Sequence, residues 1–263
     1  ISPFDLSLGW ENNLHESWGY VSQDAKKLGA NILCYSTAMR ESGRTLASKV
    51  ILSDADSKNV SKIRIGQIKY SGLYKPMTGA LQMLLNQFHE ATDTPVSFDV
   101  QDVSLAEDRL FEFPITYMTG TIDFALSGAE RLMLRQYILN GGTLFVESSD
   151  GRASFDRAFR NEMAQVFPEA KFERFSAESA MLNRPNAIQL VHPREALAAK
   201  LGENKEVMPE LYGLFVNGAY GIIYSPKDLS AGWEGAVAPY AEGYSATDAK
   251  KIGVNVLFNA LSN

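Results

Sequence analysis

From residue 63 onward, short apolar runs alternate with stretches whose apolar residues recur at helical spacing. Ile63, Ile65 and Ile68 mark a first strand, and the run at 143–147 is short and apolar like a buried parallel strand. Between them, one stretch places its apolar residues on a single helical face: Ala80, Leu81, Leu84, Leu85 and Phe88. Such alternation predicts a mainly parallel, doubly wound sheet with helices on both faces, a three-layer α/β/α fold.

Local signals indicate where several elements begin and end. Residues 96–103 alternate like a second strand, and residues 113–118 read as a third. Ser127 and Glu130 form a capping box for a helix, and Ser154 is expected to cap the next one. Asn217-Gly218 is the favoured dipeptide of a two-residue hairpin, so strands are expected on either side of it.

An internal repeat joins the two ends of the chain. Ser2–Glu11 (SPFDLSLGWE) matches Ser225–Glu234 (SPKDLSAGWE), and DAKKLGANIL from Asp24 matches DAKKIGVNVL from Asp248. In the second copy Asp248 is expected to cap a helix with one continuous apolar stripe. Two separated blocks in the same order indicate duplication of one structural element.

The repeat predicts the domain organisation. Residues 1–40 read as the C-terminal fragment of a preceding copy, residues 41–62 as a connector, and residues 63–263 as a complete α/β domain. An isolated helix as short as that of the fragment is marginal in water. Its apolar stripe is therefore expected to be buried on the complete domain, on the body of the preceding copy, or in a dimer, and the last of these is self-association through residues 1–40.

Composition excludes several classes of function. A formal net charge of -6 at pH 7 argues against nucleic-acid binding, which needs clustered Lys and Arg. The single cysteine, Cys34, excludes an internal disulfide and a multi-cysteine metal site. No run approaches the ~18 apolar residues that span a bilayer. No metal and no cofactor is predicted, because the phosphate-loop, dinucleotide and zinc motifs are missing from the sequence.

Three loops after predicted strands are the expected ligand site. In open parallel sheets, ligands bind beyond the carboxyl ends of the strands. The candidate binding residues in these loops are Tyr70, Ser71, Tyr74, Thr119, Thr121, Asp123, Glu147, Ser149, Asp150 and Arg152. Strand–helix loops also carry such residues for capping and turns alone. The repeated SPxDLSxGWE element is read first as a folding device, and as a binding element it adds Tyr224, Asp228 and Trp233 as candidate pocket walls.

A serine nucleophile is an alternative use of the third loop. Ser148 or Ser149 stands where strand-to-helix elbows place a reactive hydroxyl, although the G-x-S-x-G frame is missing. Such a nucleophile needs a neighbouring base. His192 is the loop histidine that this reading requires, and it predicts a hydrogen bond between a serine Oγ and the imidazole.

Six strings occur in order along the chain. They are IRIGQIKYSG at 63–72, FPITYMTGTIDFALS at 113–127, YILNGGTLFVES at 137–148, SFDRAFRNEM at 154–163, PELYGLF at 209–215, and IIYSPKDLSAGW followed by DAKKIGVNVL. Together they resemble the bacterial domain-of-unknown-function family 4159 over residues 63–263, and residues 1–38 resemble its C-terminal end.

The resemblance implies a flavodoxin-like fold of the class I glutamine amidotransferase-like superfamily, and a location outside the cytoplasm, in the periplasm. Amidotransferases of that superfamily carry a nucleophilic cysteine at a strand–helix elbow. The corresponding loop, Glu147–Asp150, contains none. Cys34 lies elsewhere and is expected to be a buried apolar residue.

The sequence thus favours a non-catalytic binding domain with a site at the carboxyl ends of the strands. Its expected occupant is a small polar ligand, a carbohydrate or a protein partner. Two other readings stay open: a serine-dependent hydrolase or amidotransferase-like enzyme, and a structural module that assembles through residues 1–40.

Overall fold

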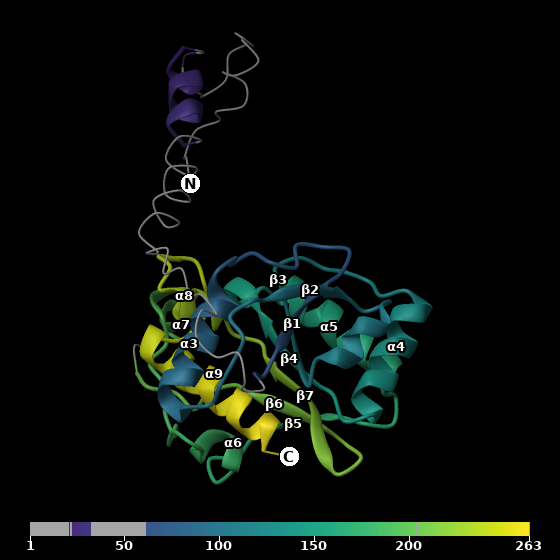
Figure 1. Cartoon of the computed structure of the whole chain (residues 1–263). Coiled ribbons are helices and arrows are strands. Elements are labelled where there is room, and N and C mark those ends of the chain that lie inside the picture. The colour runs from purple at the N-terminus through teal and green to yellow at the C-terminus, as the bar shows by residue number, and fades with distance from the viewer. Residues whose placement is uncertain (1–20, 22, 33–61, 203–204, 263) are drawn as a thin grey trace. The chain divides into compact units, whose positions relative to one another are not determined.

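The computed structural model describes residues 21, 23–32, 62–202 and 205–262. The chain divides into two units, Ile1–Val50 and Ile51–Asn263. The described part of the first unit includes a helix over residues 23–32, drawn in purple in Figure 1. Apart from Lys62, the predicted connector lies outside the described residues, as do Cys34 and most of the predicted fragment 1–40.

A seven-stranded sheet forms the centre of the second unit (Figure 1). Its order is β2-β1-β3-β4-β7-β6-β5, and its first five strands are parallel neighbours while β6 runs antiparallel to β7 and β5. The strands are β1 (Ile65–Lys69), β2 (Gln101–Ser104), β3 (Ile115–Gly120), β4 (Thr143–Ser148), β5 (Phe172–Arg174), β6 (Tyr212–Val216) and β7 (Ala219–Ser225). The predicted mainly parallel sheet is confirmed, and β2-β1-β3-β4 is the order seen in flavodoxin-like sheets.

Helices cover both faces of this sheet, which confirms the three-layer prediction (Figure 1). On one face α4 packs against α5, and on the other α3, α8 and α9 pack on one another, with α6 beside α9. The helices are α3 (Ala80–Thr92), α4 (Gly128–Leu139), α5 (Ala153–Val166), α6 (Ala180–Asn183), α7 (Glu195–Leu201), α8 (Ser230–Glu234) and α9 (Ala246–Leu261).

Each face of the sheet has its own buried apolar cluster. Along β4, Phe145 enters the cluster under α3, α8 and α9, whereas Leu144 and Val146 enter the one under α4 and α5. Successive side chains of a strand point to opposite faces, so β4 must be apolar throughout to serve both clusters. The predicted inner face of α3, from Ala80 to Phe88, is buried as expected.

Two local signals have the predicted geometry. Ser127 Oγ accepts a 3.2 Å hydrogen bond from Glu130 N, and Glu130 Oε2 accepts a 2.7 Å bond from Ser127 N, which completes the capping box of α4. Asn217 and Gly218 have φ angles of 52° and 89°. Two successive positive φ angles are what the hairpin turn between β6 and β7 requires.

The other two predicted caps, Ser154 and Asp248, were wrong. Arg152 precedes α5 without a side-chain cap, and Ser154 lies inside the helix, where its Oγ donates a 2.9 Å hydrogen bond to Thr121 O. In α9 the cap is Ser245, whose Oγ accepts a 3.2 Å bond from Asp248 N. Asp248 instead sits in the first turn and accepts a 2.9 Å bond from His192 N. A carboxylate one turn inside the helix still interacts favourably with its positive end.

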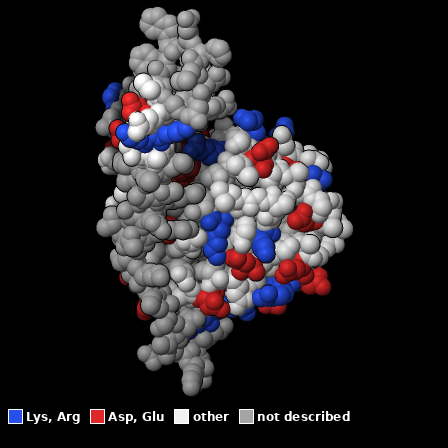
Figure 2. Space-filling model, turned by 90° about the horizontal axis from the view of Figure 1, so that it is seen from above, with Lys and Arg blue, Asp and Glu red and all other residues white. Residues whose placement is uncertain are grey.

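The second strand is shorter than predicted. β2 begins at Gln101, and from the earlier part of the expected strand Val96 forms an isolated bridge with Ile63. None of the described helices is long and apolar enough to cross a bilayer. Figure 2 shows acidic and basic side chains interspersed over the described part of the face in view.

Candidate functional site

Direct contacts join the three loops that follow β1, β3 and β4. After β1, Tyr70 Oη donates a 3.0 Å hydrogen bond to Thr119 O, at the end of β3. After β4, Ser154 Oγ reaches Thr121 O at 2.9 Å. The rings of Tyr70 and Phe124 lie 4.8 Å apart. The strand order reverses between β1 and β3, so the loops border the position where open α/β sheets bind ligands.

Gly120 allows the loops to approach one another. A Cβ at this position would collide with the hydroxyl of Tyr70 and lie 2.8 Å from atoms of the Phe155 ring. The Phe155 ring lies 5.2 Å from that of Phe124. The rings of Tyr70 and Phe124, from two of the loops, therefore pack together with Phe155 of α5, and at position 120 only a residue without a side chain fits beside them.

Glu147 is a buried carboxylate at the carboxyl end of β4. Its Oε1 accepts 2.8 Å hydrogen bonds from Tyr117 Oη and Thr119 Oγ1. Its Oε2 accepts bonds of 2.6 and 3.1 Å from the backbone N–H groups of Leu229 and Ser230. Buried charges are stable only when they are hydrogen-bonded in this way. The four donors make Glu147 a structural link between β3, β4 and α8.

Asp228 places a second buried carboxylate at the same edge. Its Oδ2 accepts a 2.8 Å hydrogen bond from Asp150 N and its Oδ1 a 3.1 Å bond from Ala231 N. Burial, followed by the nearby charge of Glu147, raises the pKa of Asp228 to about 8. Asp228 therefore carries a proton over much of the neutral range, and it ties the β4–α5 loop to the segment after β7.

The serines of the β4–α5 loop are both buried. Ser148 Oγ donates a 2.9 Å hydrogen bond to Arg152 O. The Oγ of Ser149, like that of Ser230, has no hydrogen-bond partner among the described residues. A nucleophile needs access to substrate as well as a base. Neither Ser148 nor Ser149 has an exposed hydroxyl at this elbow.

His192 is engaged elsewhere. Its Nδ1 lies 3.2 Å from Asp248 Oδ2, and its Nε2 lies 3.0 Å from Glu206 Oε1, with the side chain 65% exposed. Ser148 Oγ bonds to Arg152 O, and Ser149 Oγ has no partner among the described residues. The hydrogen bond between serine and imidazole that the hydrolase reading predicts is therefore not formed. The interpretation of Ser148, Ser149 and His192 as a catalytic set is not supported by this geometry.

Burial divides the candidate binding residues into two groups. Tyr70, Thr119, Glu147, Ser149, Asp228 and Trp233 are buried, whereas Ser71, Tyr74, Thr121, Asp123, Asp150 and Arg152 are exposed or half-buried. The Trp233 ring packs in the core, tilted against the rings of Tyr117 at 5.6 Å and Phe145 at 5.7 Å, and its Nε1 donates a 2.8 Å bond to Ala249 O. The buried group holds the edge together, and Trp233 is a core anchor rather than a pocket wall.

Exposed apolar side chains accompany the second group, and they are not among the residues predicted from the sequence. Leu73 is 44% exposed in the loop after β1, and Ile122 is 48% exposed in the loop after β3. Tyr240 is exposed in the segment after α8, where Glu242 N donates a 3.0 Å bond to Asp150 O. Loop leucines and isoleucines give no sequence signal of exposure, because the same residues usually mark the core.

Within the described ranges, no three His, Cys, Asp or Glu residues gather in a way that could hold a metal ion. Glu147 and Asp228 are the two buried carboxylates at this edge. Their oxygens are occupied by hydroxyl and backbone donors, as given above.

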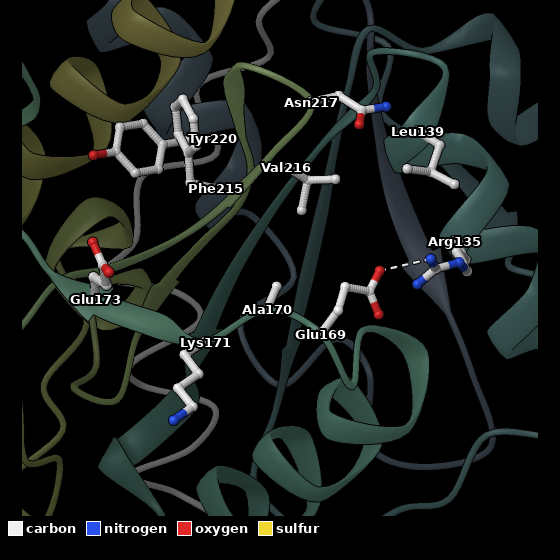
Figure 3. A pocket seen from close by; sticks show the side chains of 10 residues that line it. All are labelled: Arg135, Leu139, Glu169, Ala170, Lys171, Glu173, Phe215, Val216, Asn217 and Tyr220. Carbon is white, nitrogen blue, oxygen red and sulfur yellow. Dashed lines mark hydrogen bonds and ion pairs between the residues drawn. The ribbon is translucent and has the colours of Figure 1, made fainter.

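A pocket of about 690 Å³ opens at a different place, between α4, β5 and the β6–β7 hairpin. Figure 3 shows Arg135 and Glu169 joined on one side of it, with Leu139, Val216 and Asn217 nearby. Arg135 Nη2 donates a 2.6 Å bond to Glu169 Oε1, and its Nη1 donates a 2.7 Å bond to Val166 O. The other lining residues are Ala170, Lys171, Glu173, Phe215 and Tyr220.

This pocket adjoins the start of β7, opposite the carboxyl ends that the sequence analysis favoured. A register shift at Leu214/Phe215 in β6 accompanies the exposure of the Phe215 ring. β-Bulges of this kind re-aim side chains. Gly221 lets β7 approach α4 closely, since a Cβ there would collide with Ile138 of α4. These features depend on the pairing of distant segments, and the sequence signals only the hairpin turn.

Among curated proteins, none matches the chain. A family model described as a domain of unknown function, DUF4159, matches residues 64–261. The match covers most of the chain and ends at Leu261, the last residue of α9. The chain belongs to the DUF4159 family.

Proposed function

We propose that this chain is a non-catalytic binding domain whose carboxyl edge docks a protein partner. The observation that carries the proposal is the exposure of Leu73 and Ile122, 44% and 48%, on loops that follow two neighbouring strands. Apolar side chains of this size beside polar neighbours are typical of the centre of a protein interface.

The loops are held in place before any partner binds. The ring of Phe124 packs on those of Tyr70 and Phe155, and the hydrogen bonds of Tyr70 and Ser154 tie the loops to one another. A preorganised surface loses little conformational entropy on association. Polar side chains that suit the rim of such an interface are those of Ser71, Asp123 and Arg152, which are exposed.

The groups with catalytic chemistry are used internally, which favours binding over catalysis. Glu147 accepts hydrogen bonds from four donors, and Ser148 bonds to the backbone of Arg152. The relationship to the glutamine amidotransferase-like superfamily remains part of the proposal. It implies descent of the fold, without the thiol chemistry of that superfamily.

A differential capture experiment tests this function. Full-length protein is immobilised as wild type, as Leu73→Asp/Ile122→Asp, and as Leu132→Asp, since Leu132 is an exposed apolar residue of α4. Proteins captured from a lysate of the encoding organism are quantified by mass spectrometry. A partner should be retained by wild type and the Leu132 variant and reduced about tenfold or more by the double variant, a loss of ~1.4 kcal/mol or more. Equal capture by all three would reject the proposal.

The pocket beside the hairpin supports a second candidate, a small polar ligand or carbohydrate. Its volume of about 690 Å³ falls within the range of small-molecule sites. The exposed ring of Phe215 offers an apolar face across the pocket from the Arg135–Glu169 pair (Figure 3). A thermal-shift screen of sugars, nucleotides and amino acids tests it, with Phe215→Ser as the variant that should lose the shift. A ligand that stabilises both proteins equally binds elsewhere.

A further inference from the structure

In the helix over residues 23–32, Ala25 is buried like its repeat counterpart Ala249, but two larger residues of the same apolar stripe are exposed where their counterparts are buried. Leu28 and Ile32 are 37% and 55% exposed. The repeat aligns them with Ile252 and Val256 of α9, which are 1% and 0% exposed in the core of the second unit. In the second copy, the core of the domain therefore covers this pattern of side chains.

Several contacts of α9 are made with parts of the domain outside the repeat. A Cβ on Gly253 would collide with Leu84 of α3. Asn255 Nδ2 donates bonds of 3.1 and 2.8 Å to Met181 O and Asn186 O, and Asn255 Oδ1 accepts a 2.9 Å bond from Asn186 N. These contacts require a glycine three residues before Val256 of the apolar stripe and an amide side chain one residue before it.

Asp248, at the start of α9, makes a contact of the same kind. Its Oδ2 accepts a 2.9 Å bond from His192 N, which lies outside the repeat. The second copy of the SPxDLSxGWE block also makes contacts with residues outside the repeat. Glu234 Oε1 accepts a 3.0 Å bond from Gly79 N, and Trp233 packs on Tyr117.

The helix over residues 23–32 retains the residues that make these contacts. Asp24, Gly29 and Asn31 stand where α9 has Asp248, Gly253 and Asn255. The differences within the block exchange one aliphatic residue for another: Leu28 for Ile252, Ala30 for Val254 and Ile32 for Val256. Glycine and asparagine are poor helix formers, so an isolated helix gains nothing from having them at these positions. They suit a helix that packs closely on α3 and bonds to the backbone around Met181.

We propose that the helix over residues 23–32 is a docking helix whose partner is a second domain of this family, one with the α9 position on its α3 face open. Leu28 and Ile32 would occupy the positions of Ile252 and Val256, with Gly29 against the partner's α3. In the body described here that place is filled by α9, so the docking helix requires another body. Burial of two such side chains supplies the stabilisation that a short helix lacks.

A mutational cycle in the full-length chain tests the docking. Gly253→Leu puts a large side chain against Leu84 and opens the α9 position, whereas Lys251→Leu, on the exposed side of α9, leaves it closed. Each change is combined with Leu28→Glu/Ile32→Glu. Sedimentation gives the mass, and thermal unfolding gives the midpoint.

The Gly253→Leu chain should self-associate with increasing concentration, and Leu28→Glu/Ile32→Glu should abolish this association and lower the midpoint further. In the Lys251→Leu chain the same pair of changes should leave both mass and midpoint unaltered. If the pair has equally little effect in both chains, the proposal is overturned.

A graft keeps the proposal testable if Gly253→Leu does not fold. Ile252→Leu/Val254→Ala/Val256→Ile writes the side chains of the docking helix into α9. A helix fitted to this surface should shift the unfolding midpoint by about 4 °C or less. The control places the same three side chains in another order, Ile252→Ala/Val254→Ile/Val256→Leu, and should lose about 8 °C or more. A graft as damaging as the control would show that the helix does not fit the α9 position.

Discussion

The carboxylate of Glu147 accepts a 2.6 Å hydrogen bond from the backbone N–H of Leu229, so the end of β4 is fastened directly to the segment that follows β7. The neighbouring Ser230 N donates to the same oxygen. Backbone donors of this kind satisfy a buried charge without requiring a basic side chain. The residue that looked like a ligand-binding carboxylate is thus part of the domain's internal framework.

Replacing Glu147 with glutamine should destabilise the domain by about 2–4 kcal/mol, because an amide cannot accept from donors on both of its terminal atoms. Chemical denaturation of the full-length chain measures the change. Glu107→Gln, at an exposed position, is the control and should leave the free energy of unfolding within about 0.5 kcal/mol of wild type. A tolerated Glu147→Gln would contradict a structural role for the carboxylate.

Asp228 should make stability fall as pH rises. Its pKa is about 8 in the folded chain and near 3.8 when unfolded, so between these values the folded state holds the extra proton. Stability then falls with pH by at most about 1.4 kcal/mol per unit. After burial, the charge of Glu147 is the main cause that raises the pKa, and the charge of Asp150 adds to it. The hydrogen bond from Asp150 N and the charge of Arg194 lower the pKa.

Asp228→Asn removes this titration. The free energy of unfolding of wild type minus that of the variant should decrease between about pH 5 and about pH 8. Denaturation curves at three pH values within that window supply the comparison. A difference that stays constant or grows with pH would rule out a raised pKa at Asp228.

The fold could be predicted because its signals are local. The buried face of α3, the capping box at Ser127 and the Asn217-Gly218 turn each depend on residues a few positions apart. Patterns of this range fix the type and order of the elements. The predicted caps Ser154 and Asp248 failed because a serine or aspartate near a helix start has several possible partners, and distant carbonyl or N–H groups decided between them.

The sequence predicted where the candidate site lies but not which side chains form it. The three loops do lie together, yet the sequence could not show which of their polar side chains face inward. Glu147 bonds to a backbone group 82 residues away, and Asp228 to one 78 residues away. Because of these long-range hydrogen bonds, the two carboxylates predicted to bind a ligand hold the domain together instead. Leu73 and Ile122 are the side chains that are exposed in the loops.

The close approach of β7 to α4 should depend on Gly221. A Cβ there would collide with Ile138, so Gly221→Ala should cost about 1–3 kcal/mol. Ile138→Ala removes the colliding atom, and the double variant should be more stable than the sum of the single changes predicts, by about 1 kcal/mol. Gly128→Ala is the control, because a Cβ at Gly128 meets nothing within 4 Å. Strict additivity of the two changes would argue against the contact.

Adjacent serines in the β4–α5 loop should respond in opposite ways to loss of their hydroxyls. Ser148→Ala removes the 2.9 Å hydrogen bond to Arg152 O and should cost about 1 kcal/mol. Ser149 is buried and its Oγ lacks a partner among the described residues, so Ser149→Ala removes an unsatisfied polar group. That change should be neutral or stabilising by up to about 1 kcal/mol. Unfolding free energies of the two variants, measured side by side, decide the matter. A destabilised Ser149→Ala would reveal a hydrogen bond to Ser149 and would reopen the question of what that hydroxyl does.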